Sequence, residues 1–402
     1  MTTILDSRYS WARLGLSLLI GLIGNVGMWV VIMVMPAIQS EFGLDRAEAA
    51  YPYIMTMVGF ALGNFLIGQM VDRFGITLAL TGAALTIGLG FVLSVLSPSI
   101  WLVSAVHFFI GLGTSASFGP LIADISLWFQ RRRGIAVAIA ASSNYLSGAF
   151  WPVVLSPLLA SDGWRAVYLL LAAASVLLVI PLSLLLRRRP PMEAGSATQQ
   201  TAQAMRSGLS NRQLAWILGL AGVACCMAMS MPQVHIVSFC VDLGYGPAVG
   251  AEMLSLMLLG GVVSRLISGA LSDRLGGVMT LLIGSTLQML ALFLYLPFDG
   301  LVSLYVVSAV FGLAQGGIVP AYAIIVREYM PAKEAGRWVG FVMMATIFGM
   351  AAGGWLSGVI YDLSGSYQLA FWNGIVWNAL NIAIIATIFW RARPKDTASQ
   401  LA

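Results

Sequence analysis

Twelve long apolar runs, separated by short polar breaks, constrain this chain more than any other feature. About 20 helical residues cross a bilayer core, and backbone inside lipid must satisfy its own hydrogen bonds. We therefore predict an all-α membrane protein with twelve transmembrane helices. The first run is too long for the apolar core of a signal peptide and is expected to remain as a span. The predicted spans are 11–36, 47–71, 76–97, 100–128, 134–160, 164–186, 213–241, 247–272, 277–297, 300–327, 336–361 and 367–390.

One polar stretch divides the predicted spans into two sets of six. Residues 187–212 read RRRPPMEAGSATQQTAQAMRSGLSNR, with two adjacent prolines and few large apolar side chains. This composition is typical of a flexible linker. We predict an N-terminal six-helix half at 1–186, a cytoplasmic linker at 187–212 and a C-terminal six-helix half at 213–402.

Charged residues are scarce and lie mostly on one side of the predicted membrane. Asp, Glu, Lys and Arg form 9% of the 402 residues, against about 25% in soluble proteins, which excludes a soluble enzyme or nucleic-acid-binding domain. If both termini lie on the same side of the membrane, 18 of the 21 Lys and Arg residues lie on that side as well. The other three are Arg46, Arg165 and Arg265. Cytoplasmic loops are rich in Lys and Arg, so we predict cytoplasmic termini in a plasma membrane, the inner membrane in a bacterium. The net charge of +5 then reflects orientation, and no nucleic-acid partner is expected.

The residues that usually carry metal or catalytic chemistry are few. Cys225, Cys226 and Cys240 form no CxxC pair and lie in apolar stretches, so we expect small buried side chains. The only histidines are His107, for which we expect a packing role, and His235. A catalytic site needs a clustered nucleophile and base or metal ligands. We therefore expect no metal, no cofactor and no enzymatic activity.

The chain repeats itself at an offset of 201 residues. ALGNFLIGQMVDRFG at 61–75 corresponds to VVSRLISGALSDRLG at 262–276. A looser match pairs FIGLGTSASFGP at 109–120 with FGLAQGGIVPAY at 311–322. Duplicated halves are typical of transporters whose substrate site lies near the bilayer midplane between the halves.

The repeated GQMVDRFG and GALSDRLG resemble the loop signature of the major facilitator superfamily, and the resemblance extends along nearly the whole chain. It implies the two-bundle fold of that family. It also implies a cytoplasmic latch that breaks as the halves rock. The basic residues that usually follow the motif are replaced by Ile76–Thr77 and Gly277–Val278, which predicts a weaker latch. The motif residues are Asp72, Arg73, Asp273 and Arg274.

Other motifs resemble the monocarboxylate and oxalate/formate transporter group. They include WFQRRRGIAVAIA at 128–140, GWRAVYLLLA at 163–172 and the VHIVSFCVDLGYG stretch that begins at Val234. This resemblance implies a small organic anion as substrate, moved together with a proton. We expect a monomer whose only other partner is the lipid bilayer.

Arg265 is the charge that lies deepest inside a predicted span. It precedes Asp273 by eight residues, about 12 Å of helix, and an arginine at such depth usually faces a bundle interior or water-filled cavity. A guanidinium can hold a carboxylate through two parallel hydrogen bonds, and the resemblance implies that role for Arg265. Glu252 is about 20 Å away along the same helix, too far for an ion pair. A single buried cation favours a monoanion, and Asn64 holds the equivalent place in the repeat.

Three titratable side chains are candidates for proton coupling, each with an alternative. Asp124 either carries a proton or gates, or it pairs with Arg131–Arg133. Glu252 acts as a proton relay or is a solvated carboxylate at the outer rim. His235 lies near the substrate in the resembled group, but a lone helical histidine also serves as a packing residue.

Further side chains are candidates to line the substrate path, although Asn, Gln and Ser also join helices to one another. They are Asn25, Trp29, Asn64, Ser115, Ser117, Asn144, Tyr145, Gln315 and Tyr322.

The sequence thus predicts a secondary active transporter of a small organic anion, a monocarboxylate moved with a proton by alternating access. The alternative is an efflux pump of the same superfamily for hydrophobic or amphipathic compounds. Its interior would use the 20 methionines as a pliable surface, and it would tolerate substitution of Arg265.

Overall fold

The computed structural model describes residues 5–188 and 210–392. The predicted linker lies mostly outside this part of the chain, as do the side chains of Asp72 and Arg133. The described residues are helical and contain no strand. The helices are α1 Arg8–Gly24, α2 Val26–Phe42, α3 Arg46–Ala49, α4 Tyr51–Phe74, α5 Ile76–Val95, α6 Ile100–Thr114, α7 Gly119–Ser126, α8 Arg133–Ala174, α9 Ile180–Leu184, α10 Asn211–Asp242, α11 Pro247–Leu294, α12 Leu301–Gln315, α13 Ile318–Tyr329, α14 Ala332–Ser364 and α15 Gln368–Ala392.

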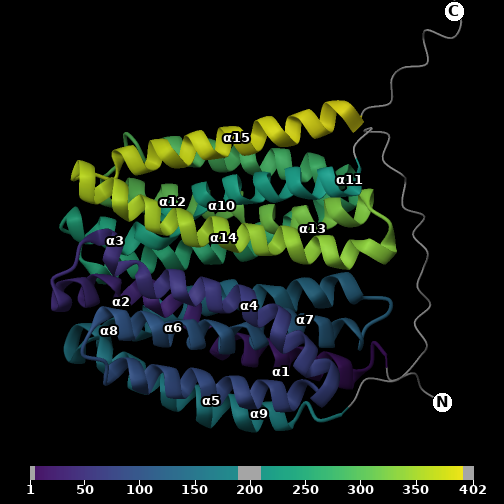
Figure 1. Cartoon of the computed structure of the whole chain (residues 1–402), viewed down its shortest axis with the longest axis horizontal. Helices are drawn as coiled ribbons and strands as arrows, with labels where there is room; N and C mark the ends of the chain where they lie inside the picture. The colour runs from purple at the N-terminus through teal and green to yellow at the C-terminus, as the bar shows by residue number, and fades with distance from the viewer. Residues whose placement is uncertain (1–4, 189–209, 393–402) are drawn as a thin grey trace, which may run out of the picture.

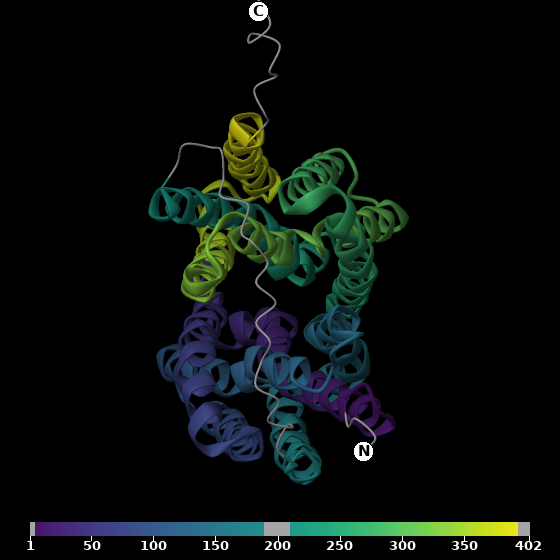
Figure 2. The same cartoon turned by 90° about the vertical axis from the view of Figure 1, so that its right-hand side faces the viewer.

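The helices gather into two groups that lie side by side. Helices α1–α9 occupy one group and α10–α15 the other, as the two views show (Figures 1 and 2). The start of α1 and the end of α15 lie at the same end of the molecule (Figure 1). We call this the basic end, because it carries Arg73, Arg188 and Arg274. The opposite end, with α3, is the outer end.

Ten helical segments in the described chain are long and apolar enough to cross a membrane. Two of them, Gly134–Leu184 and Pro247–Leu294, have 51 and 48 residues, more than twice the ~20 that one crossing needs. Each contains a glycine whose backbone leaves the helix, Gly163 (φ 77°) and Gly276 (φ 78°). These glycines lie at the polar breaks expected after residues 160 and 272, so each segment consists of two helices joined at a turn.

The sequence repeat is also a structural repeat. Gly75 and Gly276 end the repeated motif with nearly the same backbone angles, φ 88° and ψ 162° against φ 78° and ψ 166°. Glycine adopts this conformation at little cost, whereas other residues are strained. In each half a second glycine, Gly111 or Gly312, lets its helix approach a partner closely. Added Cβ atoms would meet backbone carbonyls at 2.0 Å and 2.2 Å. The helix pairs α4–α6 and α11–α12 therefore cross in the same way.

The apolar cores follow the two groups, with some exchange of residues between them. The cluster of the first group also includes Ala251 of α11, and the larger cluster of the second group takes in residues of the first, among them Trp29, Tyr53 and Tyr145. These aromatic side chains join the halves. Cys225, Cys226 and Cys240 are free and buried, as expected. Many large apolar side chains are exposed, among them Val302 at 76% and Trp390 at 70%, as on a surface that faces lipid.

Candidate functional site

Arg265 on α11 lies where the two groups of helices meet, and it is only 9% exposed. Its Nη1 donates a hydrogen bond to the carbonyl oxygen of Ala141 on α8 (2.8 Å), and its Nε donates to that of Gly316 (3.3 Å). Its Cζ is 4.2 Å from the ring centroid of Tyr145, also on α8. Arg265 forms no ion pair within the described part of the chain. The guanidinium thus bridges the halves without an acidic partner.

Three helices are interrupted in their course, and the interruptions border this region. They lie at Asn25 between α1 and α2, at Ser115–Ser117 between α6 and α7, and at Gly316–Gly317 between α12 and α13. Helix interruptions free backbone groups for other contacts. Asn25 Nδ2 donates to Ser117 O (3.1 Å), just as Arg265 donates to Gly316.

Four of the predicted path residues gather on the N-terminal side of Arg265. The indole of Trp29 donates to the backbone oxygen of Asn144 (2.9 Å), and its ring meets that of Tyr145 edge-on, with centroids 6.1 Å apart. Asn144 Nδ2 donates to Asn25 Oδ1 (3.3 Å). Asn25, Trp29, Asn144 and Tyr145 thus form one connected wall beside the guanidinium.

Gln315 lies on the C-terminal side of the same region and is fully buried. Its Oε1 accepts a hydrogen bond from Gln233 on α10, a residue that sequence reasoning missed. Its Nε2 has no partner in the described part of the chain. A Cβ on Gly261, one helical turn before Arg265, would lie 2.8 Å from the Tyr145 ring and 3.8 Å from Gln315 Nε2. Arg265, Tyr145 and Gln315 therefore surround Gly261.

Three other predicted path residues bond within their own half. Asn64 donates to Phe60 O (2.8 Å) and Ser115 to Leu112 O (2.7 Å), each inside its own span. The hydroxyl of Tyr322 donates to Asn381 Oδ1 on α15 (2.6 Å). We therefore centre the candidate site on Arg265 without these three.

His235 on α10 is fully buried with both ring nitrogens engaged. Nε2 lies 2.7 Å from Gly354 O, and Nδ1 lies 3.1 Å from the hydroxyl of Tyr367. Since a carbonyl oxygen can only accept, Nε2 carries the hydrogen and Nδ1 is free to accept from the tyrosine. Glu252, by contrast, is an exposed residue that accepts a hydrogen bond from Tyr305 on α12.

Asp124 has a different partner from the expected Arg131–Arg133. Its carboxylate accepts hydrogen bonds from both Nε and Nη2 of Arg13, each 2.9 Å long. Arg13 is 1% exposed, and its Cζ lies 4.5 Å from the Trp128 ring centroid. The sequence counted Arg13 among the cytoplasmic-side cations at the start of the first span, 11–36, and Arg265 as the only buried cation. Both interpretations were wrong, because α1 packs Arg13 against Asp124 on α7.

Arg46 was expected in an external loop, but it is 6% exposed and joins the halves at the outer end. Its guanidinium pairs with Asp242 at the end of α10 (2.8 Å) and lies 4.7 Å from the Tyr361 ring centroid. The backbone N–H groups of Arg46 and Ala47 both donate to Asp362 (2.8 Å each). We call Arg46, Asp242 and Asp362 the outer-end latch.

The repeated loop motifs lie at the basic end. Arg73, Asp273 and Arg274 are exposed and form no ion pair within the described residues. The side chain of Asp72 lies outside the described part of the chain. The cytoplasmic latch expected from these motifs thus stays a prediction.

Two helical bundles that meet around a buried cation and three interrupted helices define a multi-pass membrane protein of the transporter class. The family model of the Major Facilitator Superfamily matches residues 17–303 and 241–401. The chain therefore belongs to the Major Facilitator Superfamily.

Its relatives have diverse names. Monocarboxylate transporter 13 of Bos taurus is 28% identical over 301 residues, 73% of this chain and 68% of that protein. Agnestins efflux protein AgnL12 of Paecilomyces divaricatus is 24% identical over 344 residues, 84% of this chain and 78% of that protein. A crystal structure of a bacterial homologue of the human lysosomal transporter Spinster, inward-facing and occupied, superposes with a TM-score of 0.72. It is 14% identical and the match covers 96% of this chain and 98% of that one, so the fold is shared.

Proposed function

We propose that this protein carries a small organic monoanion, a monocarboxylate, across the plasma membrane together with a proton. The ten apolar segments, with the two long ones each counted as two crossings, make twelve spans. An even number of spans puts both termini on one side, and the positive residues of the basic end favour the cytoplasm. The halves, at 1–186 and 213–402, would then alternate access to the region around Arg265.

The observation that carries this proposal is that Arg265 is buried without an acidic partner in the described part of the chain. Two of its donors are held by backbone carbonyls, which are neutral, and no described acid neutralises the charge. A buried cation without a counter-ion is costly, so such a site favours an anion from outside. The unpartnered Nε2 of Gln315 adds a second donor nearby. One charge and one amide suit a monocarboxylate better than a dicarboxylate.

The contacts between the halves support an inward-facing state. Their described hydrogen bonds are those of the outer-end latch and the one from Arg265 to Ala141. The halves are therefore held together from the outer end down to Arg265. To face outward, the protein would have to break Arg46 from Asp242 and Asp362.

We expect Arg46→Gln to shift the population toward the outward-facing state, because it removes the charged partner of Asp242. Spin labels on Ser161→Cys and Ser364→Cys, both at the outer end, would report the separation of the halves. The variant should show a longer outer-end distance than the parent. Arg165→Gln is the control, since Arg165 pairs with Glu41 inside the N-terminal half (2.6 Å). An unchanged distance between the two spin labels in Arg46→Gln would show that the outer-end latch does not hold the halves together.

We propose that His235 links protonation to transport, because its neighbour Tyr367 also lies beside Arg46 of the latch, 5.9 Å from Cζ to ring centroid. Protonation of Nδ1 would force the tyrosine hydroxyl to turn. We expect His235→Gln to bind substrate with an affinity that no longer changes with pH. His107→Gln is the matched control, since His107 is equally buried and bonds to Val103 O (2.8 Å) and Tyr168 (2.9 Å). Equal pH profiles for both variants would refute the role.

The second candidate function is efflux of hydrophobic or amphipathic compounds. The name of the fungal relative favours it, as do buried methionines such as Met229, Met253 and Met257 in the cluster that joins the halves. Methionine adapts to varied apolar ligands.

Ligand-induced stabilisation of the purified protein separates the two functions. A ligand that binds only the folded state raises the melting temperature. The panel should contain lactate, pyruvate, 2-hydroxyisobutyrate, formate, oxalate, aromatic carboxylates and cationic dyes. Stabilisation by a monocarboxylate supports the proposal. Stabilisation by dyes alone would favour efflux.

A further inference from the structure

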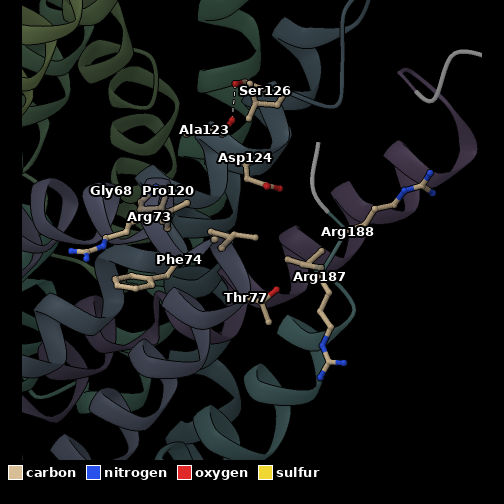
Figure 3. Close-up of a pocket in the computed structure, with 15 residues that line it drawn as sticks. Gly68, Arg73, Phe74, Thr77, Pro120, Ala123, Asp124, Ser126, Arg187 and Arg188 are labelled. Atoms are coloured by element: carbon tan, nitrogen blue, oxygen red, sulfur yellow. Dashed lines mark hydrogen bonds between the residues drawn. The ribbon is translucent and has the colours of Figure 1, made fainter. Parts of the chain in front are cut away.

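A hollow of ≈ 810 Å³ lies at the basic end of the N-terminal half (Figure 3), and Arg265 is not among its lining residues. Its walls come from the end of α4, the start of α5, α7 and residues 186–188, so every lining residue belongs to this half. Its size is that of an ordinary ligand site. Since it takes no residue from the C-terminal half, it is separate from the proposed transport path.

The walls of this hollow are apolar with a cationic rim. Phe74 and Leu127 are exposed by 54% and 52%, as side chains that meet lipid would be. Arg73 lies on one side and Arg187 and Arg188 on the other, all three exposed, with guanidinium groups that point outward from the hollow (Figure 3). The Cζ of Arg73 lies 5.2 Å from the Phe74 ring centroid, and that of Arg188 lies 5.1 Å from the Tyr9 ring centroid. The acid in the described lining, Asp124, is already neutralised by Arg13. The described rim of the hollow is therefore positively charged, which favours an anion nearby.

In the C-terminal half, a carboxylate occupies the position equivalent to this hollow. There the helix after the repeated motif begins at Gly277, and its N–H donates to both oxygens of Glu328 on α13 (3.0 and 3.1 Å). A carboxylate at a helix N-terminus satisfies free N–H groups and the helix dipole. In the N-terminal half the equivalent helix, α5, has no side-chain cap. The end of α7, which corresponds to α13, offers Ser126 and Leu127, and both line the hollow.

We propose that this hollow binds the phosphate of an anionic phospholipid. The phosphate would take the place that Glu328 fills in the other half, between the start of α5 and the rim arginines. The acyl chains would lie over Phe74 and Leu127. Basic pockets between membrane helices suit such headgroups. This site goes beyond the proposed function, because it concerns the surrounding membrane and not the transported substrate.

Thermal unfolding of the full chain in detergent tests the proposal. The additives are dihexanoyl phosphatidylglycerol, phosphatidylcholine of the same chain length and inorganic phosphate at matched ionic strength. We expect the anionic lipid alone to raise the melting temperature, with a folded-to-unfolded ratio about 100-fold higher at 100 times its Kd. Equal shifts with both lipids, or a shift with phosphate alone, would overturn the assignment to an anionic lipid.

Two sets of variants locate the effect. Arg73→Gln combined with Arg187→Gln and Arg188→Gln should lose the lipid shift, whereas Arg274→Gln, the repeat partner of Arg73, should keep it. Leu127→Glu places a carboxylate just after α7, on the wall of the hollow. It should raise the melting temperature without lipid and abolish the lipid shift, while Leu127→Gln should do neither. A full lipid shift in the triple variant or in Leu127→Glu would overturn the site.

Discussion

Replacing Arg265 by alanine is expected to abolish substrate binding while the protein still folds and reaches the membrane. Removing one partner of a buried, hydrogen-bonded charge pair costs about 2–5 kcal/mol, which corresponds to a loss of roughly 30-fold or more in affinity. The side chain lies between the halves with neutral partners, so the anion is its missing counter-ion. The measurement is the dissociation constant of the monocarboxylate that stabilises the wild type.

Two companions make the Arg265 experiment specific. Arg265→Lys keeps the charge but not the planar pair of donors, so it should bind with intermediate affinity. Arg274→Ala removes an exposed arginine of the same helical segment and should bind like the wild type. Wild-type affinity in Arg265→Ala, at normal membrane levels, would return this residue to a structural role and favour the efflux function.

Arg13→Met is expected to destabilise the protein more than any substitution at the surface. The change leaves Asp124, 7% exposed, as an unpaired buried charge, and breaking such a pair costs about 3–5 kcal/mol. Unfolding in detergent, followed by helical signal against denaturant, measures the loss. The double variant Arg13→Met/Asp124→Leu should recover much of it, because apolar replacement of both partners removes the unpaired charge.

The same pair bears on proton coupling. Two hydrogen bonds from Arg13 tie Asp124 to α1, so we expect this residue to clamp α1 to α7 and not to carry protons. Transport by Asp124→Asn that keeps its pH dependence would agree with this role. An Arg13→Met variant as stable as the wild type would show that the pair contributes little, and would reopen the proton-carrying role of Asp124.

The membrane helices could be predicted closely because lipid demands long apolar runs. The expected spans 76–97 and 213–241 correspond to Ile76–Val95 and Asn211–Asp242. The turns at Gly163 and Gly276 also lie at expected breaks, since a few polar residues with a glycine suffice to end a helix. The break between α1 and α2 at Asn25 could not be predicted, because the sequence around it is apolar throughout. It is recognised only in the folded structure, where Asn25 donates a hydrogen bond to the carbonyl oxygen of Ser117.

The candidate site was predictable only in part. Arg265 could be predicted as a site residue because a charge inside an apolar helix costs free energy of membrane insertion, and such charges usually serve a function. Its partners could not, because Ala141 and Gly316 contribute backbone carbonyls that no residue type signals. Arg13 and Arg46 were missed for another reason. Both lie near predicted span ends, where an arginine ordinarily reaches water, and only tertiary packing buries them.

Uptake into proteoliposomes is the most direct test of the central claim, that a monoanion crosses the membrane through the region around Arg265. The purified wild type and Arg265→Ala should be compared with labelled lactate, oxalate and a cationic dye, each with and without an inwardly directed proton gradient. We predict that only the monocarboxylate is taken up, that the proton gradient accelerates it, and that Arg265→Ala abolishes it. Dye transport that both proteins perform equally, without monocarboxylate uptake, would contradict the claim.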